Sequence, residues 1–317
     1  MSDKKLTIVI KGPLNSNSLN DIPGYLPYAN VIISAWESGD GSSYMPALNK
    51  THLNHAIELS NLDGVTLLLN SYQSLPEYFK SEISSVKNTS AGNRITMKLL
   101  FYSSAPAIRI CKTPYVIVTR SDSSYPDLRS MLAKMESNKE KIVTINVNFR
   151  PDYSWKFHPA DHVFGGHTSK MNLLMDECLA VCNMNENEFS AYMKSFLVGA
   201  PSFGGNSYRQ WGGVDHPVQE FYKFVECCGE IGLPISNEQI IGLCYTKINE
   251  TKVYYEKSHE YMQTYFDIVN ISEMGQYAVS KNTTKDSLIH PTLPYVQSME
   301  EFAAIYCEDD FKTMCLR

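Results

Sequence analysis

The sequence predicts an α/β protein with a Rossmann-like, mostly parallel sheet flanked by helices, followed by a helical, loop-rich C-terminal part. Short and nearly continuous apolar runs alternate with segments of helical spacing through the first half of the 317 residues. Such runs are typical of strands buried on both faces of a parallel sheet. Beyond Phe149 the chain becomes richer in polar, aromatic and glycine-bearing loops. We therefore expect an α/β half over residues 1–150 and a second part over 151–317, packed as one continuous domain.

The elements of the first half follow one another in regular order. Apolar runs of strand length are bounded by polar or turn-forming residues, and the segments between them place apolar residues at helical spacing. One of these helices has a proline at its start, where a missing backbone donor costs little. The predicted strands are residues 6–10, 30–36, 64–69, 115–119 and 141–149, and the predicted helices are residues 49–62, 75–86, 93–105 and 125–137.

The second half begins with residues 150–182, which form a polar, histidine-bearing loop leading into a helix. Further apolar spacing predicts helices, and two short runs near the end predict strands. The predicted helices are residues 185–197, 216–231 and 236–248, the predicted strands are residues 252–257 and 265–272, and a glycine-rich loop spans residues 199–215.

Composition and missing motifs exclude several classes of protein. The net charge of -6 and pI near 5.8 provide no basic stripe for a nucleic-acid backbone. No apolar stretch is long enough for a membrane helix, and residues 6–10 are too short for a signal peptide. We expect a cytoplasmic protein, with peripheral attachment to a membrane left open. Phosphate-loop, zinc-protease and dinucleotide motifs are absent, which disfavours kinase, zincin and dehydrogenase readings.

The strand at residues 115–119 ends in Arg120 and Asp122, one residue apart. Open parallel sheets bind ligands at the carboxyl ends of their strands. A carboxylate there can hold Mg²⁺ or Mn²⁺ against the phosphates of a nucleotide, while Arg120 pairs with phosphate or holds the carboxylate in place. The alternative is a loop-capping aspartate, with Ser123 or Ser124 opening the next helix.

The stretch "GNRITMKLLFYSSAPAIRICKTPYVIVTRSDSSYPD" combines an Asn-x-Arg helix with a following strand that ends in Thr-Arg-x-Asp. This block resembles the WavE-like lipopolysaccharide-synthesis family. "TIVIKGPL" and "NVIISAWE" look like its opening strand-Gly-Pro and its Ser-x-Trp strand. "FHPADHVFGGHTSKMNLL" is similar to its Asp-His-hydrophobic-Phe-Gly segment. The order and spacing agree over residues 6–180.

The resemblance implies a glycosyltransferase with a GT-A-like fold and a nucleotide-sugar donor. In such folds an Asp-x-Asp motif, or a reduced version, binds a metal and the diphosphate; here only Asp122 carries over, as a ligand for Mn²⁺ or Mg²⁺. A metal-independent version would meet the diphosphate with Arg120 and Arg94. The residues expected at the nucleotide sugar are Gly12 and Pro13 in the first turn, Trp36 at the base, Asn93 and Arg94 at the ribose or phosphates, and Arg120 and Asp122 at the diphosphate.

The histidine-bearing segment contains His158, Asp161, His162 and His167. Its spacing matches no familiar zinc motif. As part of the resemblance, Asp161 is expected in the acceptor site, as a binding group or as the general base, with His162 and His167 beside it. The glycines at 165–166 would let the loop approach the donor sugar. The alternative is that Asp161 caps a turn and His162 is a packed histidine.

The glycine-rich loop at residues 199–215 carries Tyr208 and Trp211, which we expect to stack on an acceptor sugar beneath a closing loop. An ordinary irregular loop explains the same composition. Ser202 has a faint likeness to a nucleophile elbow, but a helix precedes it and Pro201 stands beside it.

These observations predict an enzyme that transfers a hexosyl or pentosyl group from a nucleotide sugar to a hydroxyl of a glycan or glycolipid. A non-catalytic carbohydrate- or nucleotide-binding module is the main alternative, and the missing first acid of the Asp-x-Asp motif favours it. A serine hydrolase using Ser202 is the third.

Overall fold

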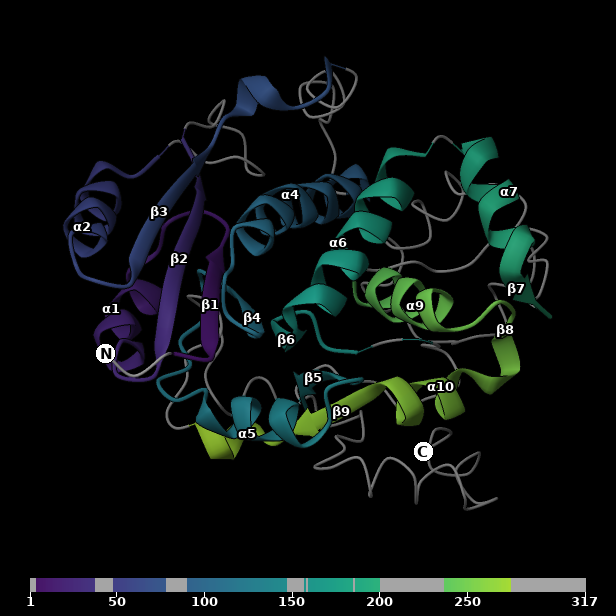
Figure 1. The fold of residues 1–317 in the computed structure, drawn as a ribbon. Helices are drawn as coiled ribbons and strands as arrows, with labels where there is room; N and C mark the ends of the chain where they lie inside the picture. The colour runs from purple at the N-terminus through teal and green to yellow at the C-terminus, as the bar shows by residue number, and fades with distance from the viewer. Residues whose placement is uncertain are drawn as a thin grey trace, which may run out of the picture.

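The computed structural model describes residues 4–37, 48–77, 90–146, 157, 159–184, 186–199 and 237–274. Within these residues the chain forms a seven-stranded, mostly parallel sheet with helices on both faces, together with a small two-stranded ladder (Figure 1). The strand order is β3-β2-β1-β4-β6-β5-β9. The predicted α/β architecture with a mostly parallel sheet is confirmed.

Four neighbouring strands are parallel and aligned, so their carboxyl ends meet at one edge of the sheet. Leu6, at the start of β1, lies opposite Ala29 of β2 and Tyr115 of β4. The β-branched and apolar residues of β1, β2 and β4 fit strands that are buried on both faces, whereas the edge strand β3 is partly exposed. The strands of the sheet are β1 (Leu6–Lys11), β2 (Ala29–Trp36), β3 (Val65–Asn70), β4 (Tyr115–Arg120), β5 (Ile142–Ile145), β6 (Val163–His167) and β9 (Phe266–Val269).

Helices cover both faces of the sheet, and each face has its own hydrophobic cluster. Successive strand residues point to opposite faces, so Ile8 and Ile10 pack with α1, α2 and α5, whereas Val9 packs with α4, α6 and α9 (Figure 1). The helices are α1 (Ser16–Tyr25), α2 (Lys50–Ser60), α4 (Ser90–Arg109), α5 (Arg129–Ser137), α6 (Thr168–Asn183), α7 (Glu186–Phe196), α9 (Asn237–Asn249) and α10 (Ser258–Tyr265).

The second half of the chain contributes to the same sheet as the first. β9 pairs in parallel with β5, with Phe266 opposite Ile142, which confirms the strand predicted at residues 265–272. The strand predicted at 252–257 is shorter: β8 (Val253–Tyr254) pairs only with β7 (Leu197–Val198). The predicted helix at 216–231 and most of that at 75–86 lie outside the described residues. No helix in the described part of the chain is long and apolar enough to span a membrane.

The helix predicted at the end of the segment 150–182 is confirmed as α6, but the loop predicted before it is wrong at residues 163–167, which form β6. This strand runs antiparallel between β4 and β5, with Phe164 opposite Val118. A Cβ atom on Gly165 would lie 2.6 Å from the carbonyl oxygen of Val116, so the glycine is required for close packing against β4. Gly165 and Gly166 therefore lie in a strand and not in a loop, and their approach to a donor sugar stays a prediction.

The loop after β4 is fastened to α1. Ser124 Oγ donates to Asp21 Oδ1 at 3.0 Å, and the Tyr125 backbone N–H donates to Asp21 Oδ2 at 2.9 Å. Helix α5 begins only at Arg129. The alternative in which Ser123 or Ser124 opens that helix is wrong, because Ser124 instead helps to fix the loop that carries Asp122.

The fit of β6 against β4 can be tested by comparing two neighbouring glycines. Gly165→Ala is expected to lower the free energy of unfolding by about 3 kcal/mol or more, because the new methyl group meets backbone atoms of β4. At Gly166 the nearest atom is the end of the Ile142 side chain at 3.0 Å, which can move. Gly166→Ala, the matched control, should change the stability by less than about 1 kcal/mol. Equal losses in urea unfolding would contradict this account of β6.

Candidate functional site

The candidate site lies at the carboxyl edge of the sheet, where β1 and β4 end side by side. Lys11 is the last residue of β1 and lies opposite Arg120, the last residue of β4. Because β6 runs antiparallel to β4, the residues before β6 reach the same edge. The Arg120 backbone N–H donates to the His162 carbonyl at 3.2 Å. The two motifs singled out in the sequence, around Asp122 and around Asp161, are thus brought together.

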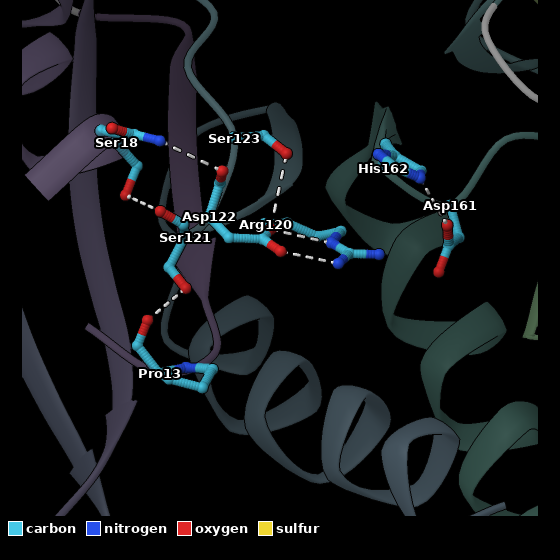
Figure 2. A network of polar contacts seen from close by, with 9 residues as sticks. Pro13, Ser18, Arg120, Ser121, Asp122, Ser123, Asp161 and His162 are labelled. Carbon is cyan, nitrogen blue, oxygen red and sulfur yellow. Dashed lines mark hydrogen bonds and ion pairs between the residues drawn. The ribbon is translucent and has the colours of Figure 1, made fainter. Parts of the chain in front are cut away.

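Arg120 and Asp122 form a bidentate ion pair at this edge (Figure 2). Arg120 Nε donates to Asp122 Oδ1 at 2.9 Å, and Nη2 donates to Oδ2 at 2.7 Å. Burial raises the pKa of the Asp122 carboxyl, but the hydrogen bonds and charge of Arg120 outweigh it, so the pKa lies below its ordinary value. The arginine therefore holds the carboxylate ionised and in one orientation. This is one of the two roles that the sequence analysis considered for Arg120; the other is pairing with phosphate.

The turn between β1 and α1 is tied to the residues that follow β4. Gly12 has a φ of +117°, which favours glycine, and a Cβ atom there would lie 3.0 Å from Ser121 Oγ. Ser121 Oγ donates to the Pro13 carbonyl, and Ser18 Oγ donates to the Ser121 carbonyl at 2.7 Å (Figure 2). Gly12 and Pro13 do form the first strand-to-helix turn. Their expected approach to a nucleotide stays a prediction.

Lys11 is the site residue that the sequence analysis missed. Its side chain faces the same side of the sheet as that of Val9, and the residue is only 5% exposed. Burial lowers the pKa of the ammonium to about 8, the charge of Arg120 adds to this shift, and the carboxylates of Asp161, Asp122 and Glu238 oppose it. One signal in the sequence could have identified Lys11: it follows directly after the apolar run "LTIVI" and continues the alternation that buries Val9.

Asp161 and His162 lie together just before β6. Asp161 is 2% exposed, and its Oδ1 atom lies 4.0 Å from His162 Nε2. Burial lowers the pKa of His162 below its ordinary value, although the nearby carboxylate of Asp161 opposes the shift. The imidazole is thus mainly neutral at pH 7. Figure 2 shows the Arg120 guanidinium extending from Asp122 towards the side on which this pair lies, and Arg120 and Asp161 interact electrostatically.

His167 does not belong to this group of residues. It is the last residue of β6 and lies opposite Tyr115, at the start of β4, so it is at the other edge of the sheet. Five residues of extended chain separate it from His162, which corresponds to roughly 16 Å. Its Nδ1 atom lies 2.9 Å from Ser169 Oγ instead. His167 therefore lies away from His162, and its predicted acceptor-binding role stays a prediction.

The remaining predicted residues are placed only in part. Trp36 ends β2 at the carboxyl edge and is 9% exposed; its contact with a base stays a prediction. Asn93 and Arg94 lie near the start of α4, but their side chains are outside what the structure describes. The candidates that fall outside the described residues are His158, Ser202, Tyr208 and Trp211.

The donor set does not fit a divalent metal at Asp122. Both of its carboxylate oxygens accept hydrogen bonds from Arg120. The charged neighbours that act on it electrostatically include Lys11, a second cation. Among the described residues, no group of three or more His, Cys, Asp or Glu side chains is arranged to hold a metal ion. Mg²⁺ and Mn²⁺ prefer several oxygen ligands, which this cluster does not offer.

Several solved structures show a remote likeness to this chain. They include the mannosyltransferase PcManGT from Pyrobaculum calidifontis in complex with GDP-Man and Mn²⁺ (11% identity, 99% of this chain and 84% of that chain, TM-score 0.31). The mannosyltransferase Ktr4p from S. cerevisiae (9%, 87% and 70%, 0.35) and mouse xyloside xylosyltransferase 1 (11%, 79% and 83%, 0.33) are others. No protein-family model and no curated protein matches the sequence, so the WavE-like resemblance stays a prediction. Likeness at this level assigns no activity.

The cost of burying Lys11 can be measured from the pH dependence of stability. Its folded pKa of about 8 lies below the ordinary 10.5, so between these values the folded state binds fewer protons than the unfolded state. The Lys11 contribution to the free energy of unfolding therefore rises with pH in this window. Lys11→Met should be more stable than the wild type by about 3 kcal/mol at pH 7, and this gain should shrink towards pH 10.5.

Urea unfolding at pH 7 and at pH 10 measures both quantities. Lys170→Met is a suitable control, because Lys170 is paired with Glu140 at 2.7 Å on an accessible surface. It should show no such gain. A gain for Lys11→Met that is the same at both pH values would contradict the assignment of the effect to the ammonium charge.

Proposed function

We propose that this chain is a glycosyltransferase that moves a sugar from a nucleotide-sugar donor to a hydroxyl of a glycan or glycolipid. One observation carries the proposal: two cations, Lys11 and Arg120, stand at the ends of adjacent strands, at the edge where open α/β sheets bind ligands. A nucleotide sugar presents a diphosphate, whose negative charge matches these groups. The resemblance of the surrounding motifs to a glycosyltransferase family supports the same class.

The reaction requires a leaving group at one end and a base at the other. The bond between the sugar C1 and the diphosphate oxygen breaks, and its electron pair stays on the diphosphate. The acceptor oxygen forms the new bond to C1 and gives up its proton. Asp161 is the proposed acceptor of that proton, because its carboxylate is buried at the same edge as the cations. His162, mainly neutral, would line the acceptor side.

The alternative is a module that binds a nucleotide sugar without transferring the sugar, and the same two cations at the sheet edge would serve it. The observation that favours this alternative is the engagement of Asp122, whose two oxygens are both held by Arg120. Asp161 is the acidic side chain of this group that we propose for proton transfer, and Glu238 is a further carboxylate that acts on Lys11 electrostatically. Release of nucleoside diphosphate from a bound donor would distinguish the enzyme from the binding module.

Donor binding can be tested by thermal unfolding with a panel of nucleoside diphosphates and nucleotide sugars. A ligand at one hundred times its dissociation constant should add about 2.7 kcal/mol to the free energy of unfolding. Arg120→Met should abolish this stabilisation. Arg129→Met removes a comparable arginine, paired with Asp127 at 2.6 Å on the surface, and should keep it. No stabilisation of the wild-type protein by any ligand of the panel would contradict the proposal.

The role of Asp161 is tested separately from donor binding. Asp161→Asn should retain the stabilisation by the donor, but lower the rate of transfer or of donor hydrolysis by about 100-fold or more, the usual contribution of a general base. Glu140→Gln, at an exposed carboxyl elsewhere, is the control. Wild-type turnover in Asp161→Asn would remove Asp161 from the chemistry while leaving the donor site intact.

A further inference from the structure

Lys11 is held firmly at the centre of the carboxyl edge. Its strand, β1, lies between β2 and β4, and Lys11 is opposite Ser34 on one side and Arg120 on the other. The Ser121 backbone N–H donates to the Lys11 carbonyl at 2.9 Å. Gly12 follows directly with its positive φ. The backbone that presents the ammonium group is thus fixed from both neighbouring strands.

The Lys11 ammonium has no partner at close range. Within the described part of the chain it makes no hydrogen bond, and no carboxylate oxygen lies within 4 Å of it, although the residue is only 5% exposed. Asp122 is already engaged by Arg120. A buried ammonium group normally donates hydrogen bonds to acceptors and pairs with a negative charge, because removing it from water is costly. Lys11 Nζ is not among the fully buried side-chain atoms of the described residues that lack a hydrogen-bond partner, so its donors are accessible to solvent or to a ligand.

Other lysine side chains in the described part of the chain have close partners, unlike Lys11. Lys247 pairs with Glu177 at 2.9 Å, and Lys134 pairs with Asp267 at 3.4 Å. Lys141 donates to the Gln263 carbonyl at 2.7 Å. Each of these ammonium groups has an oxygen partner within 3.4 Å, whereas Lys11 has none among the described residues. A bound anion would supply the partner that Lys11 lacks.

The position of Arg120 indicates which kind of anion would fit beside Lys11. Arg120 lies opposite Lys11 on the adjacent strand, and neighbouring strands are about 4.8 Å apart. Two cations that end adjacent strands suit an anion that carries charge on two neighbouring groups, as a diphosphate does. Each can donate charge-assisted hydrogen bonds to a different phosphate.

We propose that Lys11 binds the diphosphate of the donor and neutralises the charge that develops on it as the sugar leaves, so that no metal ion is needed. This inference rests on the proposed glycosyltransferase function and specifies how its leaving group is stabilised. It agrees with the poor fit of a divalent metal at Asp122. A pKa of about 8 leaves the ammonium mostly protonated at pH 7, as this role requires.

The test measures, by calorimetry, the binding of uridine, guanosine, cytidine and adenosine diphosphates and of the corresponding nucleosides. Wild-type protein should bind one diphosphate with the same affinity in EDTA as in Mn²⁺. Lys11→Met should weaken that binding by about 10- to 100-fold, the usual worth of a charged hydrogen bond, and leave the affinity for the nucleoside unchanged. Lys170→Met, at the opposite edge of the sheet, is the control and should bind as the wild type does.

Circular dichroism and urea unfolding confirm that Lys11→Met is folded, and the variant is expected to be at least as stable as the wild type. Two results would overturn the inference while leaving the proposed function standing. One is unchanged diphosphate affinity in Lys11→Met, and the other is wild-type binding that appears only with Mn²⁺. Failure of the wild type to bind any diphosphate or nucleotide sugar, with or without Mn²⁺, would overturn both.

Discussion

The antiparallel insertion of β6 beside β4 is the constraint on which the site depends. In a purely parallel sheet, the residues before a strand lie at the opposite edge from the residues that end its neighbours. Here β6 is reversed, so the residues preceding it meet the carboxyl ends of β1 and β4. The reversed strand packs closely against β4 because Gly165 has no side chain. Asp161 and Arg120, 41 positions apart in the sequence, become neighbours through this one pairing.

The site that results combines two cations, the carboxylates of Asp122 and Asp161 and a mainly neutral imidazole, and Glu238 also acts on Lys11 electrostatically. The charges are not simply paired off: Arg120 takes both oxygens of Asp122, while Lys11 and Asp161 influence each other only at longer range. Such an arrangement sacrifices stability, because a buried ammonium without a close partner is costly. Natural proteins retain buried and strained groups of this kind where a ligand completes them.

The sequence predicted the elements that depend on local patterns of residues. Apolar runs located the strands of the parallel half and the strand at residues 265–272, and the end of the run at residues 115–119 located Arg120 and Asp122. It was uninformative where the outcome depends on pairing between distant segments. "VFGGH" has two glycines and no alternation, so nothing in it predicts a buried strand. Lys11 was missed for the same reason: its burial comes from β2, β4 and the helices around them.

The geometry gives Asp122 a different role from the one the motif implied. A guanidinium group carries five N–H donors, and Asp122 accepts two of those of Arg120. Three donors remain for an anion or for the side of the site where Asp161 lies. Asp122 is itself fixed, since the Asn17 side chain donates to its backbone carbonyl at 3.5 Å. The carboxylate thus acts as the support that orients Arg120. Under the proposed function, Asp122 serves the diphosphate through Arg120, and Lys11 supplies the second positive charge.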